Sequence, residues 1–377
     1  MRVKYLLIFT ITICITFIGF VSSCKKKKDK SNGSDFDRAG MLTNIGNNIV
    51  IPNYQKLSLA VNKLDSAIAA FNVAPDLTQL GNLQNIFKEA YRAWEPCSVF
   101  GFGPASTEFL STNFNTFPID SNRINNNISS GTYNLDAASN LAAQGFPGID
   151  YLLFGTGTNN NVILARYTSS SDAANRKIYL AALCTSIKTK TTTVLNAWLP
   201  NGGNYIHTFV FATGTDVGSS TGQLVNQLNL DFETLKNYKV GLPVGIQSAG
   251  TLYPAQVEAY YCGISAELLL LQLTGLKNLY LGKGINNIDG LGFDDYLLQI
   301  GAKDSDGNSL NTTITNQFST AIIKCQDLPD PLSNTITTQT TQVKAAYQEL
   351  QKLLVLLKTD MPSALAVLIT YADTDGD

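Results

Sequence analysis

The sequence contains only one histidine, His207, in 377 residues. A hydrolytic zinc site takes three protein ligands, usually with histidines among them, and keeps a fourth position for water. A serine or cysteine triad also uses a histidine, as its general base. One histidine cannot supply an H-E-x-x-H helix, and His207 lies in a loop-rich stretch, residues 200–222. The shortage of histidine therefore argues against both kinds of hydrolase.

Charged residues are also scarce, at 15% of the chain against a usual quarter. Residues 1–30 hold seven of the 27 basic side chains and one of the 29 acidic ones. The chain from Ser31 onward therefore carries 20 basic and 28 acidic residues, a net charge of −8. A nucleic-acid-binding protein presents a concentrated basic face, so nucleic acid is excluded as a partner. An acidic body is compatible with binding cations.

Cysteine is sparse and never forms a C-x-x-C pair, so a zinc or dithiol redox site has little support. Beyond the first 24 residues, four cysteines are spaced 87, 78 and 63 residues apart. An even number permits disulfides in an exported protein. Three of the four lie in helical patterns, so buried free thiols are at least as good an interpretation. The four are Cys97, Cys184, Cys262 and Cys325.

The N-terminus has the build of a secretory signal. Basic residues at positions 2 and 4 precede an apolar run, 6–21, and small residues lead into Cys24. Residues 1–23 are therefore interpreted as a lipoprotein signal peptide, Cys24 as the lipidated residue, and 24–35 as a polar tether. An uncleaved membrane anchor is the alternative, but roughly 16 apolar residues fall short of the roughly 20 that span a bilayer.

The rest of the chain predicts helices, because no stretch alternates with period two between hairpin turns. Apolar residues recur at three- and four-residue intervals. Asp76, with Gln79 three residues later, resembles a capping box. Pro52 is expected to kink or restart the first long helix. The expected helices cover residues 44–71, 76–95, 173–198, 224–239, 255–281 and 343–357.

Long helices joined by polar connections favour an all-α fold of helical bundles. About 345 residues remain after the tether, which suits two domains. The polar stretch 155–171 is the best boundary. We therefore predict one bundle over 36–165 and a second over 166–377, with 200–222 as a long connection that has functional potential.

Several segments resemble the imelysin-like proteins, in the order expected for that family. The most specific runs from Gly145 to Gly155 and corresponds to the family pattern G-x-H-x-x-E. The resemblance implies an all-helical, two-bundle protein of the cell envelope. It also implies a peptidase M75 label, an association with iron uptake, and a site near the G-x-H-x-x-E segment. The other matching segments are 90–95, 100–104, 224–239, 241–245, 254–259 and 368–377.

The pattern is degenerate in this chain. Pro147 occupies the histidine position and Asp150 the glutamate position. Proline cannot ligate a metal, whereas Asp150 keeps a carboxylate on a shorter stem. An acid in the first turn of a helix is also favoured by the helix dipole alone, which is the structural interpretation of Asp150. The fold therefore carries over from the family, and the peptidase chemistry does not.

Carboxylates remain as the candidate site. Hard cations take oxygen ligands, and carboxylate-lined sites inside helical bundles can hold iron. Glu95 and Asp150 lie in family-like segments of the first bundle. If 255–281 is one helix, Glu258 and Glu267 point to opposite faces, and Glu258 is the better candidate. The predicted cation or ligand site comprises Glu95, Asp150 and Glu258, with iron or another divalent or trivalent cation as the ligand class and no cofactor assigned.

The sequence thus predicts a lipid-anchored envelope protein that binds a cation, or a small cationic or iron-bearing ligand, and is not an active peptidase. Two alternatives stay open. One is a metallopeptidase of the M75 type, and the other is a structural lipoprotein that binds an envelope protein. Under all three interpretations, the lipid on Cys24 is expected to anchor the chain to a membrane.

Overall fold

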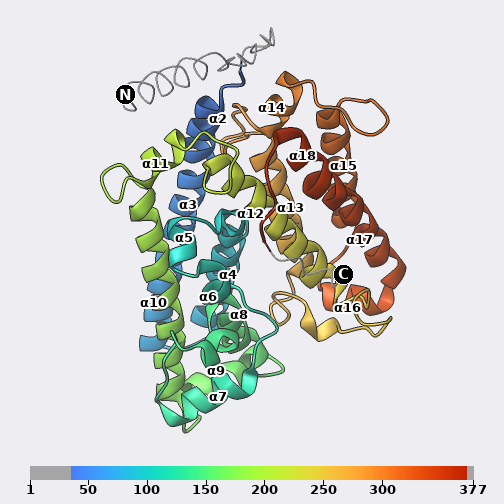
Figure 1. Ribbon diagram of the computed structural model, residues 1–377. Coiled ribbons are helices and arrows are strands. Elements are labelled where there is room, and N and C mark those ends of the chain that lie inside the picture. The colour runs from blue at the N-terminus through green and yellow to red at the C-terminus, as the bar shows by residue number, and fades with distance from the viewer. Residues whose placement is uncertain (1–34, 372–377) are drawn as a thin grey trace, which may run out of the picture. The chain divides into compact units, whose positions relative to one another are not determined.

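The computed structural model describes residues 35–371, and the part from Phe36 onward forms one compact unit (Figure 1). The predicted all-α fold is confirmed. Between residues 35 and 371 the regular structure is helical. The β-structure in this range is limited to two isolated bridges, Lys283 with Asp289 and Lys303 with Ser309. In the same range no helix combines the length and apolar character needed to cross a membrane. The predicted signal peptide and most of the tether lie outside the described residues.

The chain from Arg38 to Trp198 folds into long helices and short connecting helices. Their bounds are α2 Arg38–Asn44, α3 Ile51–Val73, α4 Leu77–Trp94, α5 Pro104–Thr107, α6 Leu110–Phe114, α7 Ser121–Ser130, α8 Gly145–Asp150, α9 Asn160–Thr168 and α10 Ala173–Trp198. Single turns of other helix types join them: the π-helices η1 Ile45–Val50 and η4 Tyr151–Gly155, and the 3-10 helices η2 Glu95–Phe100 and η3 Ala138–Ala143.

The second half continues in the same way. Its bounds are α11 Tyr205–Phe211, α12 Ser220–Thr234, α13 Ser265–Tyr280, α14 Phe293–Gln299, α15 Leu310–Gln326, α16 Leu332–Thr338, α17 Thr340–Val355 and α18 Met361–Leu365. The π-helices η5 Leu235–Gly241 and η7 Leu356–Asp360 extend α12 and α17, and η6 Pro254–Gln256 is a single 3-10 turn. The loop-rich stretch 200–222 therefore contains α11 and the start of α12.

One of two local predictions about helix starts is confirmed. Pro52 lies in the first turn of α3, directly after the π-helix η1, but Val50 and Ile51 keep helical backbone angles, so the helix changes type before Pro52 and does not restart. Helix α4 is capped by Asp76, whose carboxylate accepts the backbone N–H of Gln79 at 2.7 Å. These contacts position α4, which ends next to the candidate site.

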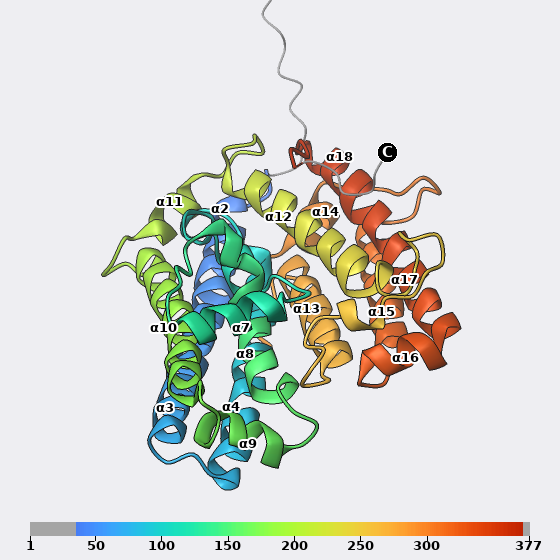
Figure 2. The same ribbon diagram turned by 90° about the horizontal axis from the view of Figure 1, so that it is seen from below.

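Helix α10 spans the predicted residues and packs along α3, which packs in turn along α4 (Figure 2). Lys188 on α10 pairs with Asp65 on α3 at 2.7 Å, and Lys177 donates to the carbonyl of Asn72. The predicted boundary places α10 in the second bundle, whereas these contacts are with helices of the first. The division at residues 165 and 166 stays a prediction.

The prediction of one helix over 255–281 is wrong. Only the 3-10 turn η6 forms at its start, and α13 begins at Ser265. Between them the backbone turns, with Ala259 at φ +49° and Gly263 at φ +67°, a left-handed conformation that ends a helix. Glu258 and Glu267 therefore do not share a helix, and the opposite-face argument does not apply. Glu267 instead forms a two-pronged ion pair with Arg92, at 2.7 and 2.9 Å.

Helix α8 is fixed by an aromatic cluster. Phe146 stacks on Tyr91 at 4.9 Å between ring centroids and meets Phe114 edge-on at 6.1 Å. Gly145 precedes it with φ +70°, and a Cβ there would lie 2.3 Å from the carbonyl oxygen of Phe114. Only glycine fits so close a backbone approach. The first glycine of the family pattern is therefore required by packing.

The four cysteines are buried free thiols, so the disulfide alternative is wrong for them. Cys97 lies on η2, Cys184 on α10, Cys262 in the turn before α13 and Cys325 on α15. Each side chain belongs to the hydrophobic core, where a thiol behaves as a small apolar group.

Candidate functional site

A buried lysine joins two of the three predicted carboxylates. Lys239 Nζ lies 2.6 Å from Glu95 Oε2 and 2.6 Å from Glu258 Oε2. The side chains of Glu95, Glu258 and Lys239 are 0%, 1% and 4% exposed. Buried charges persist only when they are paired, so each carboxylate depends on this ammonium group. We call these three residues the ionic triad.

Three irregular elements bring the triad together. Glu95 is the first residue of η2, where the chain leaves α4 before Pro96. Lys239 lies in the π-helix η5, and π turns inside a helix commonly occur at functional sites. Glu258 lies in the turn between η6 and α13. The three residues therefore come from segments separated by up to 163 positions along the chain.

Further hydrogen bonds fix Glu258. Asn115 Nδ2 donates to Glu258 Oε1 at 2.6 Å, and Tyr91 OH donates to Asn115 Oδ1 at 2.6 Å. The hydroxyl of Ser265 donates to the carbonyl of Glu258. Both oxygens of this carboxylate thus have a partner, and the chain of contacts leads back to the aromatic cluster around α8.

Glu95 is less well satisfied. Its Oε1 is buried and accepts no hydrogen bond from residues within 35–371. Burial raises the pKa of Glu95 well above its usual value, and the negative charge of Glu258 raises it further, while Lys239 opposes both. Burial lowers the pKa of Lys239, but the two carboxylates outweigh this effect and raise it overall.

Asp231 is a half-buried carboxyl group that was not among the predicted site residues. Its Oδ2 accepts from Ser98 Oγ at 3.0 Å and from Gln272 Nε2 at 2.8 Å. Burial raises its pKa to about 6, against the effects of these bonds and of Lys239. The pattern contained a signal, because Asp231 and Lys239 fall at helical spacing on the same apolar face as Leu228 and Leu235.

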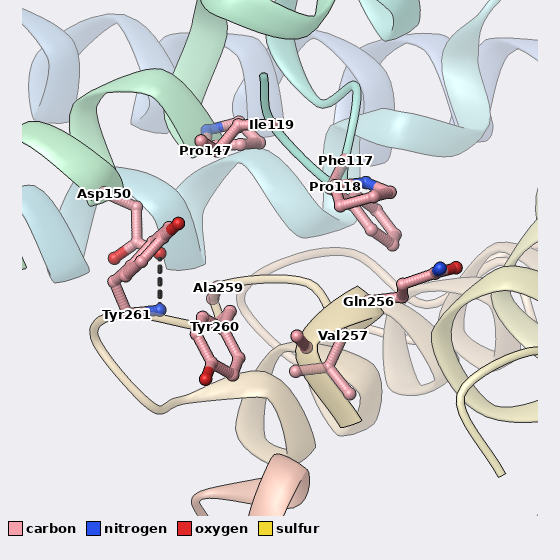
Figure 3. Close-up of a pocket in the computed structure, with 11 residues that line it drawn as sticks. Phe117, Pro118, Ile119, Pro147, Asp150, Gln256, Val257, Ala259, Tyr260 and Tyr261 are labelled. Atoms are coloured by element: carbon pink, nitrogen blue, oxygen red, sulfur yellow. Dashed lines mark hydrogen bonds between the residues drawn. The ribbon is translucent and has the colours of Figure 1, made fainter. Parts of the chain in front are cut away.

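Asp150 lies apart from the triad. It is the last residue of α8, so its interpretation as a first-turn acid is wrong. Its carboxylate accepts the backbone N–H of Tyr261 at 3.0 Å (Figure 3) and that of Cys262 at 2.8 Å. Burial raises the pKa of Asp150 to about 6, although these hydrogen bonds lower it. The residue therefore fastens the signature segment, 145–155, to the turn before α13.

A pocket of about 250 Å³ opens beside Asp150. Its walls are α8 and the 117–119 loop on one side and residues 255–261 on the other (Figure 3). Val257 and Ala259 face this pocket, whereas Glu258 between them reaches Lys239. The short segment 257–259 thus contributes to the pocket wall and also supplies Glu258 to the ionic triad. The lining residues are Phe117, Pro118, Ile119, Pro147, Asp150, Ala255, Gln256, Val257, Ala259, Tyr260 and Tyr261.

The predicted three-carboxylate site is thus only partly assembled. Glu95 and Glu258 meet at Lys239, and Asp150 occupies the pocket wall. Within the described residues, no group of three or more histidine, cysteine or acidic side chains could hold a metal ion. A cation at Glu95 and Glu258 would have to displace the ammonium group of Lys239.

The residues of a hydrolase triad are not assembled at the pocket. His207 lies exposed on α11, with its ring 4.6 Å from that of Phe211, and does not line the pocket. A G-x-S-x-G sequence does occur at 218–222, but a loop rather than a strand leads into it. The serine at its centre, Ser220, is the first residue of α12, and the preceding Ser219 caps this helix by accepting the N–H of Gly222. The motif therefore forms the start of a helix.

Comparisons with known proteins match this architecture. The iron-regulated protein A of Synechococcus elongatus is 19% identical over 295 residues, which are 76% of this chain and 75% of that protein. A crystal structure named as an iron-regulated protein A precursor, from Parabacteroides distasonis, has a TM-score of 0.74 at 16% identity and covers 89% of this chain and 97% of its own. An imelysin-like protein from Psychrobacter arcticum has a TM-score of 0.67 at 17% identity, covering 90% and 99%.

At such identities the two solved structures establish the fold alone. Family membership is established by sequence, because the model of one protein family matches residues 50–360. That range includes the signature segment, the triad and every residue that lines the pocket. The chain belongs to the imelysin family, peptidase family M75.

Proposed function

We propose that the protein is a non-catalytic binding protein of the cell envelope, anchored by a lipid on Cys24 and linked to iron uptake. Its ligand is a small cationic or iron-bearing molecule, which occupies the pocket beside Asp150. The observation that carries the proposal is the lining of this pocket, which combines one buried carboxyl group with aromatic rings and prolines.

The lining suits a cation with an organic surface. The rings of Phe117, Tyr260 and Tyr261 line the pocket, and aromatic faces attract cations by roughly 0.5–2 kcal/mol each. The carboxylate of Asp150 accepts two backbone hydrogen bonds, but an ionised carboxylate has about four acceptor positions. It can therefore keep its contacts with the turn and accept a further donor from the ligand.

The triad supports the pocket from behind. Lys239 already pairs with both Glu95 and Glu258, so these two carboxylates act as positioning residues that hold the segment 257–262 in place. We therefore move the proposed ligand contact from the three carboxylates together to Asp150 alone. Glu95 and Glu258 affect binding through the shape of the pocket wall.

The link to iron and to the envelope rests on other observations. Two of the similar proteins are named iron-regulated protein A, one by sequence and one by fold. The first 24 residues have the composition of a lipoprotein signal followed by its cysteine. Both observations favour an envelope protein that handles iron over a cytosolic enzyme.

Equilibrium titration of the purified chain tests the proposal. The probes are ferric, ferrous, calcium and zinc ions, and tetramethylammonium as an organic cation. We expect Asp150→Asn and Tyr260→Ala each to weaken binding about tenfold or more, which corresponds to about 1.4 kcal/mol. Asp136→Asn is the matched control, because Asp136 is exposed and does not line this pocket.

Two results would overturn the proposal. Ligand affinity that is unchanged in both Asp150→Asn and Tyr260→Ala would remove the pocket as the binding site. Cleavage of an unfolded polypeptide by the purified chain, abolished by a chelator, would favour the metallopeptidase alternative instead.

A further inference from the structure

Exposed apolar side chains are concentrated at one end of the described body. Three short segments, 211–217, 285–291 and 298–300, carry seven of the twenty large apolar side chains that are exposed between residues 35 and 371. Isolated exposed apolar residues need no explanation, but a cluster of them marks an interaction surface. We call this cluster the apolar end. It comprises Phe211, Val217, Ile285, Ile288, Leu291, Leu298 and Ile300.

Helix α2 holds the three segments together. Arg38 donates to the carbonyl of Thr213 at 2.6 Å and to the hydroxyl of Tyr296 on α14 at 2.8 Å. Asn44 donates to the carbonyls of Gly282 at 2.6 Å and Leu291 at 3.0 Å. Figure 1 shows α2, α11 and α14 at the same end of this unit, opposite α7 and α9. The apolar side chains therefore belong to one surface region.

The described body begins at this same end. Phe36 stacks on Tyr296, with ring centroids 4.4 Å apart and planes within 6°. The predicted lipidation site, Cys24, precedes Phe36 by 12 residues. Such a stretch spans at most about 40 Å when fully extended. An anchor at Cys24 thus keeps the end of the body that carries Phe36 near the membrane.

The charge of this region favours apolar contact over electrostatic attraction. Residues 211–217, 285–291 and 298–300 contain only Asp216 and Asp289 as charged side chains. A net charge of −2 gives no attraction to anionic headgroups. Phenylalanine, leucine and isoleucine insert favourably at the boundary between headgroups and acyl chains, because their apolar surface leaves water.

We propose that the apolar end lies against the lipid bilayer, with Phe211, Ile288 and Leu298 inserted at the headgroup level. The inference rests on the lipid anchor of the proposed function and adds a second, non-covalent membrane contact that orients the body. The pocket beside Asp150 lies on other segments, 117–119, 147–150 and 255–261. Membrane contact at the apolar end therefore leaves the pocket lining free.

Site-specific fluorescence on vesicles tests this orientation. Phe211→Cys, Ile288→Cys and Leu298→Cys, exposed by 71%, 65% and 54%, are each labelled with an environment-sensitive dye in the full chain. Leu59→Cys on α3, at 73% exposure, is the matched control. The parent chain is the labelling blank, since Cys97, Cys184, Cys262 and Cys325 are buried. The chains are reconstituted on phosphatidylcholine vesicles.

We expect dyes at 211, 288 and 298 to shift their emission to the blue and to be quenched by lipids that carry a quencher at shallow depth. The dye at 59 is expected to report water. The shift should persist at about 1 M salt, where the Debye length is about 3 Å, because apolar insertion is not screened.

The proposal would be overturned if, on vesicle-bound chain, the dyes at 288 and 298 showed the same emission and quenching as the dye at 59. A protein would then remain as the partner of this surface. A shift that disappears at high salt would also overturn it. Failure of the chain to float with vesicles would overturn the anchor and this orientation together. The dye results leave both the anchor and ligand binding at Asp150 unaffected, and only failure to float also removes the anchor from the proposed function, so the two failures can be told apart.

Discussion

Asp150 accepts the backbone N–H of Cys262 at 2.8 Å, across 112 positions of the chain. The same carboxylate accepts the N–H of Tyr261, so one side chain fastens the end of α8 to the turn that precedes α13. The acidic position of the family pattern is thereby a structural link and a wall of the pocket at once. Its protonation state affects the stability of this link.

Asp150 is expected to make the protein more stable as the pH falls from neutral. Burial raises the pKa of Asp150 to about 6 in the folded state, above about 4 for an aspartate in the unfolded chain. The folded state thus binds the proton more tightly, and the free energy of unfolding rises as the pH is lowered from about 7 to about 4. Asp231, with its pKa also raised to about 6, contributes in the same direction.

The variant Asp150→Asn removes one of these two contributions. Its free energy of unfolding, measured by urea denaturation, should change less between pH 7 and pH 4 than that of the parent, by on the order of 1–3 kcal/mol. Asp136→Asn should retain the parental slope, because Asp136 is 80% exposed. An unchanged slope in Asp150→Asn would contradict the raised pKa.

Lys239→Met is expected to destabilise the protein strongly. The substitution leaves Glu95 and Glu258 buried without their cation, and removal of one partner of a buried ion pair costs roughly 3–5 kcal/mol. Lys188→Met is the control, because its pair with Asp65 is partly exposed and such pairs contribute about 0–1 kcal/mol. Urea denaturation at pH 7 measures both.

A second substitution separates charge from packing. Glu95→Gln introduced into Lys239→Met removes one buried carboxylate and should restore part of the lost stability, by on the order of 1–2 kcal/mol. Equal stability of the single and double variants would mean that the loss comes from packing of the lysine stem rather than from the unpaired charge.

Gly145→Ala should destabilise the protein more than a positive φ angle alone explains. Alanine at φ +70° costs roughly 1–2 kcal/mol, and its Cβ would also lie 2.3 Å from the backbone oxygen of Phe114. Gly301→Ala is the matched control, since Gly301 has φ +65° and no atom within 4 Å of an added Cβ. If thermal unfolding shows that the two variants lose equal amounts of stability, the close approach of Gly145 to Phe114 is contradicted.

The four core cysteines should resist thiol reagents in the folded protein. Burial raises the pKa of Cys184 and of Cys325 to about 12, and that of Cys97 and Cys262 further. Thiolate is the reactive form, so a maleimide at pH 7 should leave these residues unmodified in native protein and modify all four in denaturant. Peptide mapping by mass spectrometry identifies the sites. Rapid native labelling of any of the four would contradict its burial.

The sequence predicted the positions of α4 and α10 well, and the start of α12 to within four residues, because their apolar residues repeat every three or four positions. It failed at 255–281, where an equally apolar run contains a left-handed turn at Ala259 and Gly263. Apolar periodicity reports which side chains are buried, but a buried turn is as apolar as a buried helix.

The candidate site was predicted only in part, because its contacts join residues that lie far apart along the chain. Glu95, Asp150 and Glu258 were selected individually from family-like segments, and each is buried. Their partners could not be read from the chain, since Lys239 meets Glu95 from 144 positions away and Tyr261 meets Asp150 from 111. A lysine on an apolar helix face is a signal of a buried partner, but it does not identify which carboxylate that partner is.

The sequence by itself determined the helical fold, the family and the replacement of histidine by Pro147 in the segment 145–155, because these depend on local spacing and residue type. The tertiary structure decided what the retained carboxylates do. Glu95 and Glu258 share one buried cation, since only packing of η2, η5 and the turn before α13 brings them within 2.6 Å of Lys239. Asp150 faces the pocket instead, because its helix ends against that same turn.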